Sequence, residues 1–278
     1  MKRLVITADD FGAAREVNEA VETAHQGGIL SAASLMVTGA AATDALHRAR
    51  KLPFLRVGLH LVLVEGRPVL PPSAVPDLVD AEGNFRNDMA RAGAAMFLRA
   101  PVRLQLAREI EAQFQAFAAT GLVFDHVNAH KHFHLHPTIA SLVMAMAQKF
   151  GVRAARVPLE PRAVLARIEP TPPDRIAALT APFARLQRWR FRAAGLRVPD
   201  QVFGLRWSGA MTAPRLRGLL AHLPPGLSEI YLHPATGPYP GSAPGYRYDE
   251  ELTALLDEEA AGCARAPGIR LGGFSEFS

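Results

Sequence analysis

Cysteine is almost absent from this sequence. The single residue, Cys263, cannot form an intrachain disulfide, and since it stands near the C-terminus outside any motif we interpret it as a bystander. No apolar run approaches the roughly 18 uncharged residues of a membrane-spanning helix. The opening MKRLVITADD does not read as a signal peptide, because its short apolar run ends at two aspartates. Together these absences predict a cytoplasmic protein.

Nucleic-acid-binding motifs are also lacking, although the chain is basic. The net charge is +5 and the pI about 9.8, and residues 151–200 hold ten arginines against four acids. Neither zinc-finger spacing nor an RNA-binding aromatic pattern accompanies these arginines, so we expect no nucleic-acid partner. Internal repeats and low-complexity linkers are missing too. We therefore expect one domain over residues 1–278, with a Pro- and Arg-rich insertion at about 160–203.

The hydrophobic pattern alternates between strands and helices. The expected strands cover residues 3–7, 31–39, 56–63, 122–130, 152–158 and 228–237, and a last strand begins near residue 268. The expected helices cover residues 13–28, 42–52, 98–121, 137–151, 213–226 and 248–262. This alternation predicts an α/β fold with mainly parallel strands. Residues 64–90 are Pro-rich and irregular, and a loop of this length is usually functional.

Five of the ten histidines stand in HVNAHKHFHLHP, residues 126–137. Histidine is the commonest metal ligand in proteins. In an extended chain His130, His132, His134 and His136 would lie on one face. They cannot all bind one ion, because a catalytic zinc takes about three protein ligands. One Asp and two His would fit, and the other histidines would support the ligands, contact substrate or be structural; a solvated His-rich loop is the alternative.

Acids and histidines end several of the expected strands, which is where parallel α/β folds gather their catalytic groups. Asp9 and Asp10 follow the first strand, and a divalent cation would offset their mutual repulsion. Since successive strand side chains point to opposite faces, we expect the two to have different roles; the alternative is that they cap the following helix. His60 alone suits a buried structural histidine, and His233 alone suits either a general acid or a strand end. The combination indicates a metal-dependent hydrolase and leaves its substrate open.

Four of these segments, TADDFG, GLHL, NAHKHFHLHP and EIYLHP, resemble the YdjC-like carbohydrate deacetylases in sequence and in order. The resemblance spans nearly the whole chain. It implies a distorted (β/α) TIM-like barrel that removes N-acetyl groups from amino sugars with one divalent metal ion. Zinc is the first expectation for the ion, and magnesium, manganese or cobalt are alternatives. The resemblance also allows for a homodimer.

Carried over by position, the resemblance implies that Asp10, His60 and His130 bind the metal. It also implies that Asp9 is the general base and that His233 is the general acid that protonates the departing amine.

The sequence departs from the family pattern D-x-H-H-H-x-H at two positions. Asn128 replaces the Asp and Lys131 replaces the second His, and neither is a ligand position. We expect these two changes to affect the groups that support the metal ligands and the specificity for the sugar. We expect Asn128, His132 and His134 to support the metal ligands. For contacts to the sugar, the candidate residues are Arg156, Glu160, Tyr246 and Arg247.

A longer set of segments, including GLHLVLVEGRPVLPP, LRWSGAMT and EIYLHPATG, is similar to the hopanoid biosynthesis-associated branch of this family. That similarity implies an N-acetylglucosaminyl group on a bacteriohopanepolyol as substrate, and a location peripheral to the inner membrane. Residues 184–197, ARLQRWRFRAAGLR, mix Arg with Leu, Trp and Phe as a membrane-surface segment does. A solvated basic helix packed on the barrel explains them as well.

Three other functions fit parts of the pattern. A deacetylase of soluble chitooligosaccharides would use the same residues. A metal-dependent phosphoesterase would usually require two metal ions and more carboxylate ligands. A His-rich metal-binding protein would require only the local histidine cluster, and the separate positions of Asp10, His60 and His233 argue against it.

Overall fold

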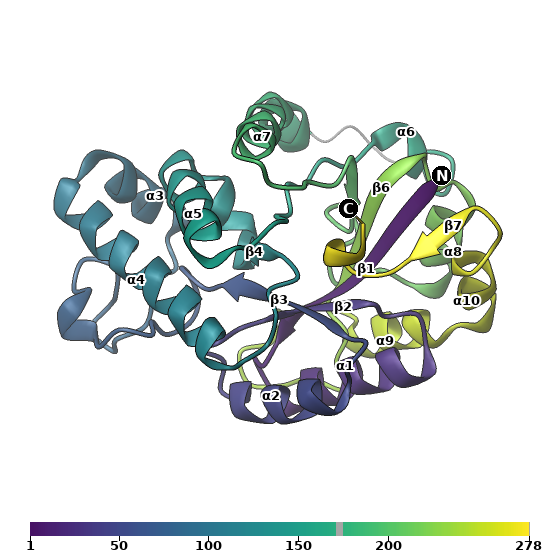
Figure 1. Cartoon of the computed structure of the whole chain (residues 1–278), viewed down its shortest axis with the longest axis horizontal. Coiled ribbons are helices and arrows are strands. Elements are labelled where there is room, and N and C mark those ends of the chain that lie inside the picture. Colours follow the sequence, from purple (N-terminus) through teal and green to yellow (C-terminus); the bar gives the residue numbers. More distant parts are fainter. Residues whose placement is uncertain (171–174, 278) are drawn as a thin grey trace.

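Parallel strands form the centre of the molecule, and helices surround them (Figure 1). The computed structural model describes residues 1–170 and 175–277, and for residues 175–180 we describe the backbone alone. In this part of the chain the sheet has seven strands in the order β4-β3-β2-β1-β6-β5, and β7 pairs with the start of β1. The strands are β1 (Lys2–Phe11), β2 (Ala32–Leu35), β3 (Arg56–Leu61), β4 (Val127–Ala129), β5 (Gln201–Phe203), β6 (Gly226–Leu232) and β7 (Ile269–Leu271).

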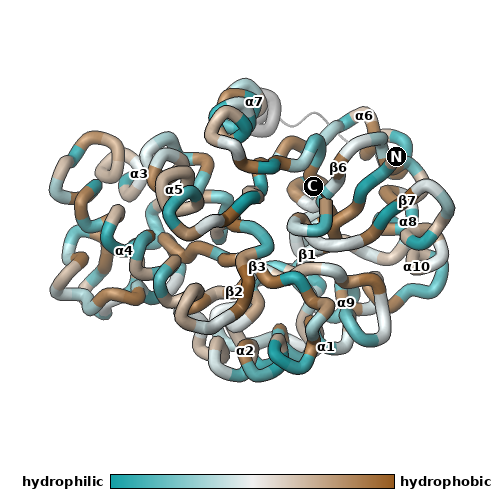
Figure 2. Tube along the Cα trace, viewed as in Figure 1, coloured by the Kyte–Doolittle hydropathy of each residue, from teal (hydrophilic) through white to brown (hydrophobic). Residues whose placement is uncertain are grey.

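The described helices are α1 (Arg15–Gly27), α2 (Ala42–Lys51), α3 (Met89–Leu98), α4 (Ala100–Ala119), α5 (Pro137–Phe150), α6 (Arg162–Leu165), α7 (Arg175–Ala193), α8 (Ala213–Ala221), α9 (Tyr248–Leu256) and α10 (Glu258–Ala264). Short 3₁₀ turns are η1 (Pro72–Ala74), η2 (His130–Leu135) and η3 (Phe274–Glu276). Figure 2 shows hydrophilic stretches along the outer helices α1 and α2 and hydrophobic ones at the strands. No described helix has both the length and the apolar character needed to cross a bilayer.

The sheet curls until its two edges are linked by backbone hydrogen bonds outside the named strands. Next to β4, Val127 N–H donates to Ala154 O at 3.0 Å, and Ala155 N–H donates to Arg197 O at 2.9 Å. Further along, Val202 N–H of β5 donates to Leu159 O at 3.0 Å. The expected α/β barrel is confirmed as a parallel sheet curled into a distorted TIM-like half-barrel. Its strands place their C-terminal ends around one mouth.

Two buried side chains of α4 hold the loop that follows β3. Glu109 accepts hydrogen bonds from the backbone of Val69 and Leu70 at 2.9 and 3.0 Å. Gln113 bonds both backbone groups of Val62, accepting at 2.9 Å and donating at 2.7 Å. Because buried backbone groups require such partners, this loop is fixed beside the ends of the strands.

Several expected boundaries differ from the structure. The expected helix over 248–262 is two helices, because Asp257 interrupts it and caps α10 by accepting from Ala260 N–H at 2.8 Å. The irregular segment 64–90 contains η1 and runs into α3. Within the expected insertion at 160–203, residues 171–174 lie outside the described residues, whereas β5 belongs to the sheet.

Candidate metal centre and active site

The end of β1 turns both of its acids toward one histidine. Asp10 has a left-handed backbone with φ of 61°, and the register between β1 and β2 shifts between Ala8 and Phe11. As a result Asp9 Oδ1 lies 4.0 Å from His60 Nδ1, and Asp10 Oδ1 lies 3.3 Å from His60 Nε2. The expectation that the two side chains point to opposite faces is therefore wrong, because the chain leaves the regular strand at Asp10. A left-handed non-glycine residue costs about 1 kcal/mol or more and persists where its surroundings hold it.

Three side chains from the ends of β1, β3 and β4 converge into one cluster. Asp10, His60 and His130 each offer a ligand atom, and these atoms lie within 4.8 Å of one another. His130 Nδ1 is 3.1 Å from Asp10 Oδ1. Burial raises the pKa of Asp10, but the charge of His130 and its hydrogen bond to Asp10, together with the neighbouring His60, outweigh this effect and hold the pKa well below its usual value.

The donor atoms of this cluster fit a divalent cation. His60 Nδ1–H donates to Asn128 Oδ1 at 2.7 Å, and this bond fixes the tautomer that leaves a lone pair on Nε2. His60 Nε2 is buried and has no hydrogen-bond partner among the described residues. A buried imidazole nitrogen without a partner, facing a carboxylate, is the arrangement that a metal ion completes. One oxygen and two nitrogen ligands suit zinc and do not exclude other divalent ions.

Asn128 connects this cluster to the rest of the interior. Its side-chain NH₂ donates to Asp9 Oδ1 at 3.2 Å and to Ser34 Oγ at 2.9 Å. Behind it, Ser34 Oγ bonds His126 Nε2 at 3.0 Å. An amide can accept from His60 while it donates to Asp9, which a carboxylate at this position could not do while ionised. These contacts join Asn128 directly to His60, and its role in supporting the metal ligands stays a prediction.

Asp9 belongs to a separate group, in which it pairs with a buried arginine. The buried guanidinium of Arg156 contacts both oxygens of Asp9, at 2.5 and 2.9 Å, and Glu229 Oε1 at 2.7 and 3.0 Å. The ring of Tyr231 stacks on the guanidinium, 4.5 Å from its carbon. Burial raises the pKa of Asp9, but the Arg156 charge, with smaller contributions from His60 and His233, lowers the pKa far below its usual range. Asp9 is therefore a carboxylate at any ordinary pH.

The histidine segment is not extended. Lys131 and His132 both have φ of 53°, so the chain coils into η2, and the alternation expected to put four histidines on one face is wrong. His132 Nε2 instead bonds the hydroxyl of Tyr231 at 3.0 Å, and His134 Nε2–H donates to the carbonyl of Arg156 at 2.7 Å. Burial lowers the pKa of His134 to about 4, partly offset by that hydrogen bond. Both rings are thus neutral and tied to the interior.

His233, the candidate general acid, follows directly after β6. Its backbone N–H donates to the buried carboxylate of Glu251. Its ring contacts the rings of Tyr231 and Tyr246, with centroids 5.6 and 5.3 Å away. Its Nδ1 is buried without a hydrogen-bond partner among the described residues. The position of His233 at the same mouth as the cluster is consistent with the acid role expected for it.

The four expected sugar contacts fall into different environments. Arg156 is fully buried on Asp9, so its contacts favour a positioning role over contact with a sugar. Glu160 accepts from three successive backbone N–H groups, residues 204–206, at 2.9–3.1 Å, and so anchors that loop. Tyr246 lies against His233, and its hydroxyl bonds Ser208 Oγ at 2.8 Å. Arg247 is on the surface and pairs with Glu250.

Three acids near the site were not singled out from the sequence. Glu65 Oε2 lies 3.5 Å from His130 Nε2 and 3.2 Å from Lys131 Nζ. Glu229 and Glu251 are buried beneath Arg156 and His233. Glu229 could have been found, because an acid within the apolar run EIYL is unusual unless it is paired. Nothing in the local pattern marks Glu251, which stands in an ordinary amphipathic helix.

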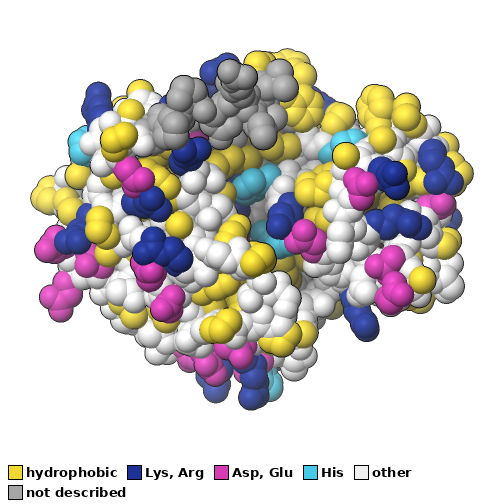
Figure 3. Space-filling view, turned by 180° about the vertical axis from the view of Figure 1, so that it is seen from behind, with side chains coloured by type: hydrophobic (Ala, Val, Ile, Leu, Met, Phe, Trp, Pro, Cys, Tyr) yellow, Lys and Arg dark blue, Asp and Glu magenta, His cyan; other side chains and the backbone are white. Residues whose placement is uncertain are grey.

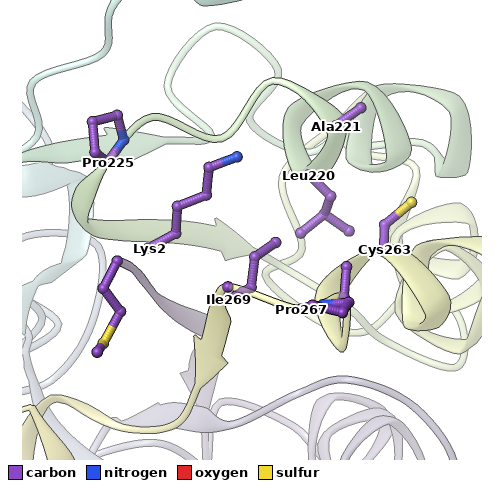
Figure 4. Close-up of a pocket in the computed structure, with 10 residues that line it drawn as sticks. Lys2, Leu220, Ala221, Pro225, Cys263, Pro267 and Ile269 are labelled. Atoms are coloured by element: carbon purple, nitrogen blue, oxygen red, sulfur yellow. The ribbon is translucent and has the colours of Figure 1, made fainter.

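The surface view agrees with an open site. Figure 3, seen from behind, shows histidine side chains in a hollow near the centre of the face, with basic and acidic side chains beside them. Another hollow of about 450 Å³ lies at the opposite ends of the strands, where Lys2, Pro225 and Ile269 begin or precede strands (Figure 4). Cys263 lines it, and none of the residues considered for chemistry does.

The chain is similar to proteins that are named carbohydrate or chitooligosaccharide deacetylases. A carbohydrate deacetylase of Brevibacillus brevis is 37% identical over 150 residues, covering 54% of this chain and 57% of that protein. One of Geobacillus stearothermophilus is 29% identical, covering 98% and 97%. A chitooligosaccharide deacetylase of Serratia marcescens is 35% identical, covering 54% and 58%. The chain thus spans just over half the length of two of these relatives.

The fold has a counterpart among solved structures. A protein of Enterococcus faecalis V583, named for cellobiose-phosphate cleavage, superposes with a TM-score of 0.76 at 24% identity and covers 100% of this chain and 99% of its own. That likeness supports the barrel architecture alone. The family described as YdjC-like protein matches residues 3–266, which is nearly the whole sequence. The chain belongs to the YdjC-like protein family.

Proposed function

We propose that this protein is a metal-dependent carbohydrate N-deacetylase that hydrolyses the N-acetyl group of an N-acetylglucosamine-type sugar. The convergence of ligand atoms from Asp10, His60 and His130 at the mouth of the barrel carries the proposal. The names of the relatives support the reaction class. When bound, a divalent ion, with zinc preferred, supplies Lewis-acid chemistry that polarises an acyl oxygen and lowers the pKa of water.

Asp9 is proposed as the general base. It is ionised and lies within 4.0 Å of His60, so it can receive a proton from water at the ligand cluster. Its lowered pKa makes it a weak base, and we therefore expect a contribution near the lower end of general-base catalysis, about 100-fold. Arg156 fixes its carboxylate in one orientation, which favours a positioning role for Arg156.

His233 is proposed as the general acid. Glu251 fixes its backbone, and Tyr231 and Tyr246 restrict its ring, so the imidazole is held in place to protonate a departing amine. Tyr246, beside this ring, is the sugar contact that the geometry favours most. Glu160 and Arg247 remain predictions as sugar contacts.

The rival functions fit less well. Among residues 1–170 and 175–277, one cluster of suitable ligands is present, and it contains one carboxylate. A two-metal phosphoesterase would require more carboxylate ligands than this. A metal buffer built on the histidine segment would need accessible rings, whereas His132 and His134 are tied to Tyr231 and to the backbone.

The finer proposal is that the sugar is the N-acetylglucosaminyl head group of a bacteriohopanepolyol. The similarity between the motifs of this chain and those of the hopanoid-associated branch supports this finer proposal. Soluble chitooligosaccharides are the alternative, which the Serratia marcescens relative supports.

Acetate release tests both levels of this proposal. Metal-loaded protein is incubated with the N-acetylglucosaminyl hopanoid or with N,N′-diacetylchitobiose, and a chelated sample serves as control. Release from the hopanoid alone supports both levels. Release from chitobiose alone retains the deacetylase and rejects the lipid-linked substrate. If metal-loaded protein releases acetate from neither, the deacetylase proposal is wrong.

A further inference from the structure

A row of buried hydrogen bonds leads from the end of the chain to His60, one of the candidate metal ligands. It starts at Asp125, which stands just before β4. The links that follow are His126, Ser34 and Asn128, and the last of these bonds His60. None of the four linking residues is more than 3% exposed. Since solvent cannot satisfy buried polar atoms, each of these groups depends on its neighbours in the row.

Three neighbouring strands bring these residues together. Leu59 N–H of β3 donates to His126 O at 2.9 Å, which extends the pairing of β3 with β4. His126 and Asn128 are two residues apart, so their side chains point to the same face of the sheet. Gly58 of β3 lies beside Ser34 of β2 in the register, and a Cβ atom on Gly58 would lie 2.5 Å from the ring of His126. A glycine is thus required where the ring of His126 crosses β3 to reach Ser34.

The C-terminal segment fixes the first residue of the row. The chain returns to the sheet at its end, where the C-terminus is marked in Figure 1. There Asp125 accepts from Phe274 N–H at 3.1 Å, and from the N–H and the hydroxyl of Ser275 at 2.8 and 2.6 Å. Burial raises the pKa of Asp125, but the hydrogen bonds from His126 and Ser275 outweigh this effect and hold the pKa below its usual value. Asp125 is therefore an ionised carboxylate, which can only accept hydrogen bonds.

The amide of Asn128 has one possible orientation. Asp9 is also ionised, so Asn128 must turn its NH₂ group toward this carboxylate, at 3.2 Å. The same NH₂ group donates to Ser34 Oγ at 2.9 Å. The amide oxygen is left for His60, whose Nδ1–H donates to it at 2.7 Å. The orientation of the amide thus leaves the lone pair of His60 on Nε2.

The hydroxyl of Ser34 sets the tautomer of His126. Ser34 Oγ accepts from Asn128 and has one hydrogen of its own. Within the described part of the chain, its other partner is His126 Nε2 at 3.0 Å, so the hydroxyl donates to this nitrogen. His126 then carries its hydrogen on Nδ1 and donates it to Asp125 at 3.0 Å. Every bond in the row therefore donates toward Asp125.

The order Asp125, His126, Ser34 is also that of a hydrolytic triad, in which a histidine activates a serine nucleophile. Burial excludes this function here, because Ser34 is 0% exposed and its oxygen already accepts from Asn128. What remains is an effect on His60. A carboxylate that polarises a row of donors leading to a ligand histidine fixes the tautomer of that histidine and raises its basicity.

We propose that Asp125, His126 and Ser34 are positioning residues that act through Asn128 to hold His60 in the tautomer that binds a metal ion. These four linking residues, Asp125 to Asn128 by way of His126 and Ser34, are called the relay below. The relay connects the ligand cluster to the C-terminal segment, and none of its members is a ligand. The proposal deepens the proposed function and rests on it, because it requires the metal centre.

Nuclear magnetic resonance of protein with nitrogen-15 in its histidines tests the direction of the relay. The ring shifts distinguish a nitrogen that carries hydrogen from one that does not. In metal-free protein we expect a neutral His126 with its hydrogen on Nδ1, and the signals missing from His126→Gln assign this ring. In zinc-loaded protein, Ser34→Ala should shift the ring signals of His60, although the two residues are joined only through Asn128. Ser31→Ala should leave them in place.

Zinc affinity tests the effect of the relay on the metal site. Ser34→Ala is expected to weaken zinc binding about three- to fivefold, which is less than the loss expected for a direct partner of the ligand. Ser31→Ala is the matched control, because Ser31 is also buried beside β2 and bonds the backbone of Ile6. It should leave zinc affinity unchanged. Calorimetric titration measures the affinities, and thermal unfolding checks that each variant is folded.

Three results would overturn the proposal. The first is a His126 that carries hydrogen on Nε2. The second is a folded Ser34→Ala variant that binds zinc as tightly as the wild type. The third is an equal loss of affinity in Ser31→Ala, which would mean that any lost hydroxyl beside β2 disturbs the metal site.

Failure of the proposed function gives different results. Wild-type protein that binds zinc and releases no acetate would refute the deacetylase activity and leave the relay standing. Wild-type protein that binds no zinc would refute the metal centre, and the relay as a support for it.

Discussion

Asp9 and Asp10 are neighbours in sequence and at one strand end, but their surroundings are opposite. Asp9 belongs to an arginine side, made of Asp9, Arg156 and Glu229, in which a guanidinium compensates the carboxylates. Asp10 belongs to a ligand side, made of Asp10, His60 and His130, in which no arginine or lysine pairs with the carboxylate among the described residues.

This difference indicates which acid requires a cation. On the arginine side Arg156 already compensates the carboxylates, although Glu229 Oε2 has no hydrogen-bond partner among the residues described. On the ligand side His60 Nε2 is buried without such a partner, and no arginine or lysine among these residues pairs with Asp10. A buried imidazole lone pair beside a carboxylate that no arginine or lysine compensates is the arrangement that a bound cation satisfies. The two adjacent aspartates thus have different surroundings, although both face the same histidine, and the different roles expected for them stay a prediction.

The largest effect is expected when a metal ligand of the ligand side is removed. His130→Ala is expected to abolish stoichiometric metal binding and to lower acetate release by roughly 1,000-fold or more, because several kcal/mol of Lewis-acid stabilisation is lost. His222→Ala, at an exposed histidine on the surface, is the matched control and should change neither quantity. Isothermal titration with zinc and an acetate assay measure both. Full activity without bound metal would contradict the assignment.

Removing Arg156 from the arginine side should lower the free energy of unfolding. Arg156→Ala leaves Asp9 and Glu229 buried without a counter-charge, and removing one partner of a buried ion pair costs about 3–5 kcal/mol. Chemical denaturation measures the free energy of unfolding. Arg217→Ala, which breaks a pair on the surface, should cost much less, because solvent screens exposed ion pairs. Similar losses for the two variants would show that the arginine side is not the buried network described.

Asn128 connects the two sides, because it bonds both His60 and Asp9, and its removal should give an intermediate effect. Asn128→Ala removes the acceptor that fixes the tautomer of His60, and we expect zinc affinity to fall about 10- to 100-fold. Ser34→Ala removes a bond to the same amide without touching His60, so its effect on zinc affinity should be smaller. Zinc titration monitored by calorimetry distinguishes the two. Unchanged affinity in Asn128→Ala would mean that the amide does not orient the ligand.

Glu65 should give the smallest effect. Its carboxylate is half-exposed and 3.5 Å from His130, so Glu65→Gln is expected to lower zinc affinity only about two- to fivefold. Glu82→Gln, another exposed acid in the same loop region, provides a control with no expected change. A loss as large as that of His130→Ala would mean that Glu65 is itself a ligand.

The sequence was informative where the chemistry depends on strand ends. Parallel strands place their C-terminal residues at one mouth, which is why acids and histidines at several strand ends could be expected to lie together. The choice of Asp10, His60 and His130 as the metal ligands came from the resemblance to the YdjC-like deacetylases. The same logic identified His233 after β6. The pattern of strands predicted only that these side chains would lie at one mouth; their individual roles were implied by the resemblance.

Other features depend on backbone conformations that cannot be predicted from the residue types. The left-handed conformations at Asp10, Lys131 and His132 redirect side chains, and none of the three is a glycine. The short strand β5 has three residues and depends on pairing with β6, so its own pattern is too weak to predict it. Arg156 looks like a surface residue in sequence and is buried only because Asp9 and Glu229 meet it there.

Metal content of Asp9→Asn and Asp10→Asn, measured side by side, tests the central claim most directly. Each purified variant is loaded with zinc, desalted and analysed for metal by mass spectrometry. The account predicts about one zinc ion per chain in Asp9→Asn, as in the wild type, and far less than one in Asp10→Asn. Loss of zinc from Asp9→Asn with retention in Asp10→Asn would contradict it.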